Sequence, residues 1–153
     1  MQQTEKETGK LFHELWKKFT NKIFNQSLEL IFNRYKVNKF DFKIIKNKDI
    51  LDAGCGSGRH TVASAYLGAK KVVGIDISKG QVKLNNKNFK HIKNIIFKQS
   101  STDQIGYKSN HFDYVISSGV IHHTKDFEKS LDEIIRVCKK NGKIFLLIYG
   151  AGG

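Results

Sequence analysis

The stretch Asp49-Ile-Leu-Asp-Ala-Gly-Cys-Gly-Ser-Gly-Arg-His60 decides the fold of this chain. A short apolar run ends at Asp52, and glycines follow at the alternate positions Gly54, Gly56 and Gly58. Glycine allows tight turns and close approaches, so the pattern predicts a buried strand, a sharp turn beside a ligand and the start of a helix. The exposed N–H groups of such a loop suit a carboxylate or a phosphate.

The spacing of the glycines separates two kinds of nucleotide loop. A dinucleotide-binding loop has the pattern Gly-x-Gly-x-x-Gly or Gly-x-Gly-x-x-Ala, which would need glycine or alanine at position 59. That position holds Arg59. The alternate spacing therefore argues against a nicotinamide oxidoreductase, which we keep as a distant third hypothesis.

Predicted strands and helices alternate from residue 49 onward. Strands are expected at 50–51, 71–76, 94–97, 112–117 and 143–149; helices are expected from the glycine loop to about residue 67, at 79–91 and at 126–139. Gly68 signals a helix end, and Asn141-Gly142 a turn into the last strand. The strands are continuous apolar runs, as in sheets covered on both faces. The sequence thus predicts an α/β fold with a doubly wound, mostly parallel, Rossmann-like sheet of five strands.

The N-terminal part, residues 1–44, is predicted to be a helical cap on a core at 45–153. Apolar residues recur at spacings of three and four between positions 10 and 35, which indicates one amphipathic helix or two helices broken near Asn25-Gln26-Ser27. The apolar stripe packs on the body of the domain, closes over a ligand pocket, or does both.

Composition limits the class of protein. The 153 residues suit one domain, and neither a membrane span nor a signal peptide is evident in the sequence. Cys55 and Cys138 form neither a metal pattern nor a disulfide framework, so we expect two reduced thiols in a cytoplasmic protein without a metal.

The net charge of +13 raises the question of a nucleic-acid partner. Nearly all of the basic residues are lysine, whereas base and phosphate recognition favours the planar fork of arginine, so nucleic acid is not the favoured partner. Lys79, Lys83, Lys87 and Lys90 repeat at helical spacing. This stripe is either a solvated helix face or a surface for an anionic partner.

A second acid, Asp76, follows the second predicted strand, eighteen residues beyond Gly58. Its carboxylate can accept hydrogen bonds from both hydroxyls of a ribose, and Ile77 offers an apolar wall to an adenine ring. The alternative is that Asp76 caps the next helix. The glycine loop at this distance favours the ribose.

Four stretches in the same order resemble successive motifs of the class I S-adenosylmethionine-dependent methyltransferases, closest to the methyltransferase type 11 group. The resemblance covers about residues 45–149, and the stretches are Asp52-Ala-Gly-Cys-Gly-Ser-Gly58, Gly74-Ile-Asp-Ile-Ser78, Phe112-Asp-Tyr-Val-Ile-Ser-Ser-Gly-Val-Ile-His-His123 and Arg136-Val-Cys-Lys-Lys-Asn-Gly142.

The resemblance implies S-adenosylmethionine as cofactor and assigns residues to it. Gly54 and Gly56, in the loop that Gly58 closes, should meet the methionine part, Asp52 its amino group, and Asp76 the ribose. Where the family commonly has an acid that contacts the adenine amino group, this chain has Ser101, followed by Thr102; a hydroxyl can still accept that hydrogen bond. Ser118 should flank the cofactor.

The acceptor side is less defined. The amino-methylating nucleic-acid enzymes share an Asn/Asp-Pro-Pro-aromatic motif after the fourth strand, and this chain contains no proline. His122 and His123 follow Ser118 and are candidates to take the acceptor's proton, although a structural role fits them as well. Methyl transfer needs little beyond alignment of the acceptor in a dry pocket.

The last strand would be an apolar edge, because the family's last two strands do not follow it in this sequence. A truncated product, a partner chain or second copy over this edge, or a shortened relative would each account for it. The leading hypothesis is a methyltransferase acting on a small-molecule or lipid-like acceptor. The alternative is a cofactor-binding, catalytically weak module that works in a complex or dimer.

Overall fold

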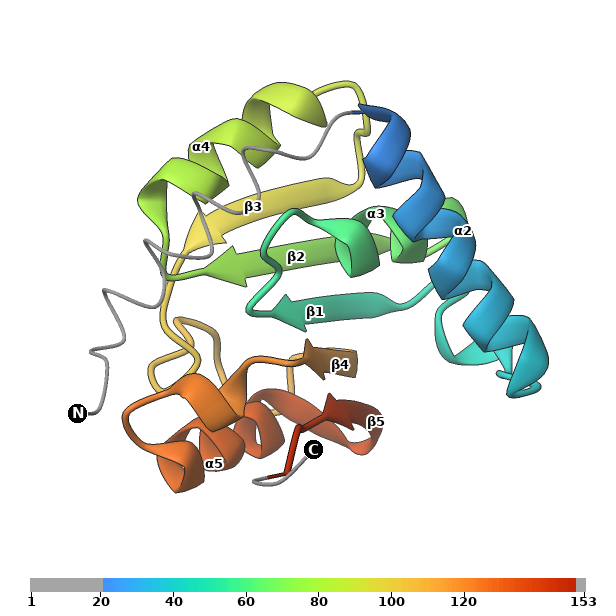
Figure 1. The fold of residues 1–153 in the computed structure, drawn as a ribbon. Helices are drawn as coiled ribbons and strands as arrows, with labels where there is room; N and C mark the ends of the chain where they lie inside the picture. Colours follow the sequence, from blue (N-terminus) through green and yellow to red (C-terminus); the bar gives the residue numbers. More distant parts are fainter. Residues whose placement is uncertain (1–20, 151–153) are drawn as a thin grey trace.

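Five parallel strands form the centre of the molecule in the computed structural model, which describes residues 21–150 (Figure 1). They lie in the order β3-β2-β1-β4-β5, and all neighbours pair in parallel. The strands are β1 (Asp49–Ala53), β2 (Lys71–Asp76), β3 (Ile95–Gln99), β4 (Phe112–Ser118) and β5 (Cys138–Leu147). The predicted five-stranded, doubly wound sheet is confirmed.

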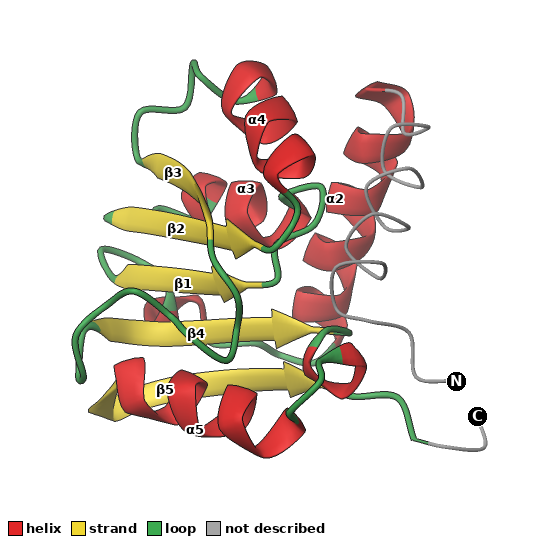
Figure 2. Ribbon diagram, turned by 90° about the vertical axis from the view of Figure 1, so that its left-hand side faces the viewer, coloured by secondary structure: helices red, strands yellow, loops and turns green. Residues whose placement is uncertain are grey.

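Helices cover both faces of this sheet (Figure 2). They are α2 (Asn21–Val37), α3 (Arg59–Tyr66), α4 (Lys79–Asn88) and α5 (Phe127–Val137), with short 3-10 helices η1 (Phe42–Ile44) and η2 (Ile121–His123). None of the helices in residues 21–150 is long and apolar enough to cross a membrane. Gly68, with φ 87°, follows the end of α3 as predicted.

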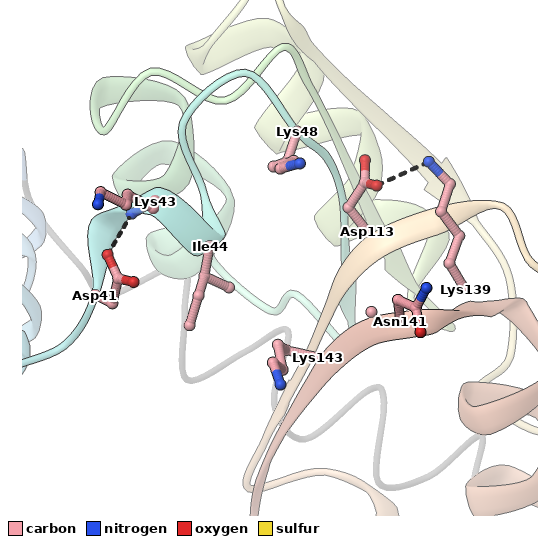
Figure 3. Close-up of a pocket in the computed structure, with 9 residues that line it drawn as sticks. Asp41, Lys43, Ile44, Lys48, Asp113, Lys139, Asn141 and Lys143 are labelled. Carbon is pink, nitrogen blue, oxygen red and sulfur yellow. Dashed lines mark hydrogen bonds and ion pairs between the residues drawn. The ribbon is translucent and has the colours of Figure 1, made fainter.

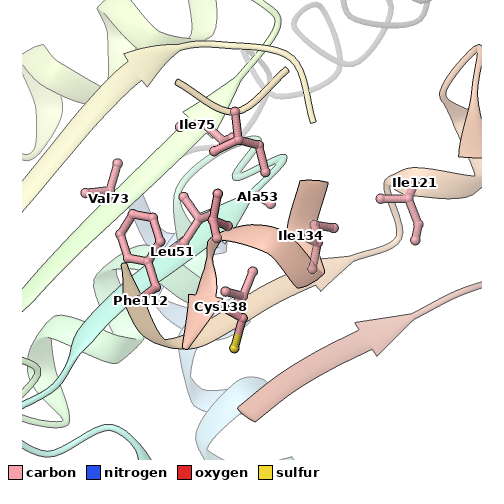
Figure 4. Close-up of a cluster of buried hydrophobic side chains, with 11 residues drawn as sticks. Leu51, Ala53, Val73, Ile75, Phe112, Ile121, Ile134 and Cys138 are labelled. Carbon is pink, nitrogen blue, oxygen red and sulfur yellow. The ribbon is translucent and has the colours of Figure 1, made fainter. Parts of the chain in front are cut away.

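Alternate residues of each strand fill two different cores. Leu51, Ala53, Val73 and Ile75 pack with Ile134 of α5 on one face (Figure 4). Residues of the opposite parity, such as Ile50 and Val72, pack toward α3 on the other face. Both faces of β1 and β2 are therefore buried, which explains why their sequences are continuous apolar runs.

Helix α2 packs on the body of the domain. Its Leu28, Ile31 and Tyr35 are buried together with Val62 and Ala63 of α3. The helix runs without interruption through positions 25–27, so no break occurs there. The apolar positions predicted before residue 21 lie outside the described residues, and the division of the chain at residue 44 stays a prediction.

The junction of α5 and β5 differs from the expectation. The helix ends at Val137 and β5 begins at Cys138, so Asn141-Gly142 lies inside the strand instead of forming a turn before it. The register with β4 jumps there: Phe112 pairs with Cys138, and Tyr114 with Lys143. The surplus residues of β5 form a bulge, which an Asn-Gly pair accommodates as readily as a turn.

Strand β5 is one edge of the sheet, as expected. Ile144, Ile148 and Tyr149 are 37%, 42% and 64% exposed along this strand and just beyond it. In the predicted helix 126–139, Leu131, Ile134, Ile135 and Cys138 are expected on one apolar side. In the structure Ile134 is buried, whereas Ile135 is 53% exposed. A helix residue one position away points about 100° around the axis, so only one of the two can face the sheet.

Candidate functional site

The strand order reverses between β1 and β4, since the chain continues from β1 toward β2 and β3 on one side and from β4 toward β5 on the other. In open parallel sheets, ligands bind beyond the carboxyl ends of the strands at such a reversal. The glycine loop follows β1, and Ser118 ends β4. The topology therefore brings the two best-defined predicted motifs to one place.

The glycine loop has the backbone that its sequence predicts. Gly54, Gly56 and Gly58 have φ of 83°, 50° and 81°, a region that favours glycine. A Cβ atom on Gly54 would lie 2.4 Å from Cγ1 of Val120, in the loop after β4. Glycine is thus needed at position 54 both for its backbone angle and because the two loops touch there.

The N–H groups of these glycines are used inside the protein, which the sequence did not predict. Gly54 donates to the carbonyl of Ile75 at 2.9 Å, and Gly58 donates to that of Cys55 at 2.8 Å. Gly56 donates to Oδ2 of Asp76 at 2.9 Å. The glycines therefore shape the loop and let a ligand approach closely, rather than offering it these three donors.

Asp52 is buried at the carboxyl end of β1, with 2% of its surface exposed. The hydroxyl of Thr61 donates to its Oδ2 at 2.7 Å. Burial raises the pKa of Asp52 to about 6, although the Thr61 hydrogen bonds oppose the rise. A buried carboxylate of this kind is stabilised by a cation placed beside it.

Asp76 ties the glycine loop to the end of β2. Its Oδ1 accepts from the N–H of Ser78 at 2.9 Å, while its Oδ2 accepts from Gly56. The cap of α4 is Ser78, whose hydroxyl accepts from the N–H of Gln81 at 3.2 Å. A carboxylate has about four acceptor positions, so its capacity is not limited to two donors.

The residues predicted for the adenine side follow β2 and β3. Ile77 and Ser101 are half-buried. Thr102 is buried, and its hydroxyl donates to Oγ of Ser130 in α5 at 3.2 Å. The side chain of Thr102 thus anchors this loop to α5.

The loop after β4 holds Ser118, which is half-buried, and the two histidines. Both ring nitrogens of His122 are buried and have no hydrogen-bond partner in the described part of the chain. The ring centroid of His122 lies 4.0 Å from that of His123 and 5.3 Å from that of Tyr149. Burial and then His123 lower the pKa of His122, so its imidazole is neutral at pH 7.

Several residues near the site were not among those predicted from the sequence. The hydroxyls of Ser57 and Ser117 are buried without a partner among residues 21–150. Asn85 of α4 donates to the carbonyl of Gly56 at 2.8 Å and so supports the loop. Serine inside a glycine motif is a detectable signal; the Asn85 contact spans 29 positions and leaves no local pattern.

A second ionisable group, the half-buried His60, lies at the start of α3. Nδ1 of His60 is 3.4 Å from the hydroxyl of Tyr35 in α2. Burial, followed by Arg59 and Arg34, lowers the pKa of His60 to about 4. Burial thus displaces the pKa values of Asp52 and His60 in opposite directions.

The residues present fit S-adenosylmethionine. Asp52 and Asp76 offer carboxylates to an ammonium group and to ribose hydroxyls, and the orphaned hydroxyls of Ser57 and Ser117 are donors and acceptors without a partner in the described chain. Within residues 21–150, no group of three His, Cys, Asp or Glu side chains is arranged to hold a metal ion.

The family of methyltransferase domains matches residues 51–146 of this chain. The ubiquinone biosynthesis O-methyltransferase of Pelagibacter ubique is 33% identical over 119 residues, which are 77% of this chain and 48% of that protein. The tRNA U34 carboxymethyltransferase of Ruthia magnifica is 34% identical over 107 residues, 68% of this chain and 33% of that protein. The chain thus spans at most about half the length of these two relatives.

The fold is also that of solved methyltransferase structures. The crystal structure of an S-adenosylmethionine-dependent methyltransferase from Aquifex aeolicus has a TM-score of 0.61 and 25% sequence identity, and the match covers 68% of this chain and 57% of that one. The matched family segment contains the glycine loop, Asp76 and the loop after β4. The chain therefore belongs to the family of methyltransferase domains and has the fold of the class I S-adenosylmethionine-dependent methyltransferases.

Proposed function

We propose that this chain transfers a methyl group from S-adenosylmethionine to a small-molecule or lipid-like acceptor. The observation that carries the proposal is the meeting of Asp52, Asp76 and the glycine loop at the reversal of strand order, where Gly56 is hydrogen-bonded to Asp76. The name of the ubiquinone biosynthesis relative supports a lipid-like acceptor, whereas the name of the tRNA relative points to RNA. A cytoplasmic location stays a prediction of the sequence.

The donor would be held by residues from four strand ends. Asp52 would face the amino group of the methionine part, beside Gly54, Gly56 and Gly58, and Asp76 would accept both ribose hydroxyls. Ile77 and Ser101 would line the adenine, with Thr102 anchoring the loop that holds Ser101, and Ser118 flanking the cofactor from β4. When bound, S-adenosylmethionine supplies an electrophilic methyl group on a sulfonium sulfur.

His122 is our candidate to take the acceptor's proton. Its neutral imidazole has one nitrogen that can accept a proton, and neither ring nitrogen has a partner among residues 21–150. His123 is exposed and lies beside it. Such a group suits an acceptor whose nucleophile carries a proton, namely a hydroxyl or an amine, while the packing of His122 on Tyr149 is the structural alternative.

Transfer of a radiolabelled methyl group to separated lipid, small-molecule, RNA and protein fractions tests the acceptor class. We expect label in the lipid or small-molecule fraction; label in RNA or protein alone would contradict the proposal. With the labelled acceptor in hand, His122→Asn should lower kcat by about 100-fold, the usual range for a general base, and should remove the acidic limb of the pH–rate profile. His123→Asn is the matched control, and a profile that His122→Asn leaves unchanged would assign His122 a packing role.

A second candidate function is a catalytically weak module that works in a complex or as a dimer. The exposed apolar residues Ile144 and Ile148 along the edge of β5 favour it, because an uncovered apolar edge pairs readily with another chain. Light scattering distinguishes a monomer from a dimer. Methyl transfer by the monomer alone would argue against this candidate.

A further inference from the structure

A separate basic pocket lies near the amino ends of the strands, away from the carboxyl ends where the glycine loop lies. It has a volume of about 320 Å³, and Figure 3 shows that the segment before β1, the first residues of β4 and the bulge of β5 surround it. Its lining contains the lysines Lys43, Lys48, Lys139 and Lys143, the acids Asp41 and Asp113, and the uncharged Ile44, Asn141 and Gly142.

The negative charge in this pocket is already engaged. Oδ1 of Asp113 lies 2.8 Å from Nζ of Lys139, and its Oδ2 accepts from the N–H of Asp49 at 2.9 Å. Burial, the largest single influence, acts to raise the pKa of Asp113. The hydrogen bonds from Lys139 and Asp49 and the charges of Lys139 and Lys48 together outweigh it, so the pKa lies below its usual value. Oδ1 of Asp41 accepts from the backbone N–H of Lys43 at 2.9 Å.

Three ammonium groups are left over. Those of Lys43, Lys48 and Lys143 have no ion-pair partner within the described residues. Against them stands the single remaining charge of Asp41, so the pocket keeps a surplus of two positive charges. A concave site with a surplus of this sign attracts small anions.

The bulge in β5 is what opens this site. A Cβ atom on Gly142 would lie 2.6 Å from Sγ of Cys138 and 2.9 Å from the carbonyl oxygen of Asp113. Glycine lets the strand pass this close, and the extra residues place Lys139, Asn141 and Lys143 around the pocket. Bulges at sheet edges commonly redirect side chains in this way.

Charged groups near the amino ends of the neighbouring strands add to the positive electrostatic potential around this pocket. His111, just before β4, has a pKa lowered by burial and then by Lys108, with smaller contributions from Lys71 and Lys139; only Asp49 acts in the other direction among its charged neighbours. Lysine ammonium groups bind phosphate as point charges, and a strongly charged dianion gains more from them than a carboxylate does.

We propose that this pocket binds the phosphate group of a small phosphorylated ligand, at a site distinct from the methyl-donor site. The two sites lie at opposite ends of the same strands, so binding at one does not require the other. Lys48 and Lys143 would contact the phosphate from two sides, Lys43 would add its charge from η1, and Asn141 would donate from its amide.

Calorimetric titration with inorganic pyrophosphate tests this site. The unmodified protein should bind it, and Lys48→Gln with Lys143→Gln should weaken binding by about tenfold or more, since two close charges are lost. The matched control, Lys79→Gln with Lys83→Gln, removes two exposed lysines of α4 and should change binding less than about twofold. Lys43→Gln is a second pocket variant, located in an exposed 3-10 helix, should the double variant not fold.

Equal weakening in the pocket and control variants, or no heat of binding with pyrophosphate, would overturn the proposal. A labelled single-stranded RNA serves as a second arm. If RNA competes with pyrophosphate, and if RNA binding is lost only in the pocket variants, the ligand is a nucleic-acid backbone and the proposal of a small phosphorylated ligand is wrong. If the protein binds pyrophosphate but does not bind RNA, the result supports a free phosphorylated ligand. S-adenosylmethionine binding should be the same in all these variants, which separates this test from that of the methyl-donor site.

Discussion

The two ends of the parallel sheet differ in how they treat charge. At the carboxyl ends, Asp52 and Asp76 are held by hydrogen bonds from Thr61, Gly56 and Ser78, and several polar atoms nearby are buried. At the amino ends, lysines line an open pocket. The carboxylate of Asp113 forms an ion pair with Lys139 and accepts a hydrogen bond from the N–H of Asp49.

This difference shows what makes a site in this fold. The carboxyl end is built from glycine-shaped backbone and buried acids, so it suits a ligand that needs fixed hydrogen-bond partners. The amino end relies on exposed ammonium groups, whose attraction is less directional and is screened by salt. We therefore expect changes at the carboxyl end to cost more than equivalent changes at the amino end.

The largest expected effect is that of Gly54→Ala. The new Cβ would lie 2.4 Å from Cγ1 of Val120 at a φ of 83°. Left-handed strain and overpacking together should lower the free energy of unfolding by about 3 kcal/mol or more. Urea unfolding measures it. Val120→Ala in the same chain should recover only the overpacking part, and a Gly54→Ala variant as stable as the parent would contradict the close contact of the two loops.

The next largest expected effect is a pH dependence of the free energy of unfolding, which comes from Asp52 and His60. Asp52 keeps its proton to about pH 6 when folded but only to about 3.8 when unfolded, so its contribution makes stability fall as pH rises through this range. His60 titrates near 4 when folded and 6.5 when unfolded, so its contribution makes stability rise from pH 4 to 6.5. Each amounts to about 3 kcal/mol and the two oppose each other.

Single variants separate these two contributions. With Asp52→Asn, stability should rise more steeply between pH 4 and 6.5 than in the parent protein; with His60→Gln, it should fall instead. Thermal unfolding at half-unit pH steps follows both. Parallel curves for the two variants would mean that neither group has the displaced pKa that burial gives it.

Gly142→Ala is the corresponding change at the amino end and should have the smallest effect. Its Cβ would lie 2.6 Å from Sγ of Cys138, but the φ of Gly142 is not in the left-handed region. Overpacking alone should cost about 2 kcal/mol. Pyrophosphate binding should weaken while S-adenosylmethionine binding is retained. A variant that loses both ligands equally would erase the distinction between the two ends.

The site at the carboxyl ends of the strands was largely predictable from sequence, because short local patterns of residues specify it. The alternate glycines, the apolar runs and the acids at strand ends are each patterns of a few adjacent residues. The structure places Asp52, Asp76 and Ser118 near the carboxyl ends of the strands, as expected. The role of Ser78 as the α4 cap, rather than Asp76, needed the geometry, because both acceptors occur within three residues of each other.

Other features depend on contacts between distant segments. The bulge of β5 comes from pairing with β4, so Asn141-Gly142 looked like a turn and the lysine pocket left no motif. The contact of Val120 with Gly54 and that of Asn85 with Gly56 likewise join loops far apart in the sequence. The cofactor roles of the individual residues are predictions that binding measurements must test.

Calorimetric titration with S-adenosylmethionine tests the methyl-donor site most directly, using the parent protein, Asp76→Ala and the double variant Lys48→Gln with Lys143→Gln. The parent and the lysine variant should bind equally, and neither should bind NAD. Asp76→Ala should lose about 100-fold in affinity, since two hydrogen bonds to a charged group disappear. Asp76→Asn, which keeps one acceptor oxygen, should lie between. No binding by the parent protein, or equal affinity in Asp76→Ala, would contradict a methyl-donor site at the carboxyl end of this sheet.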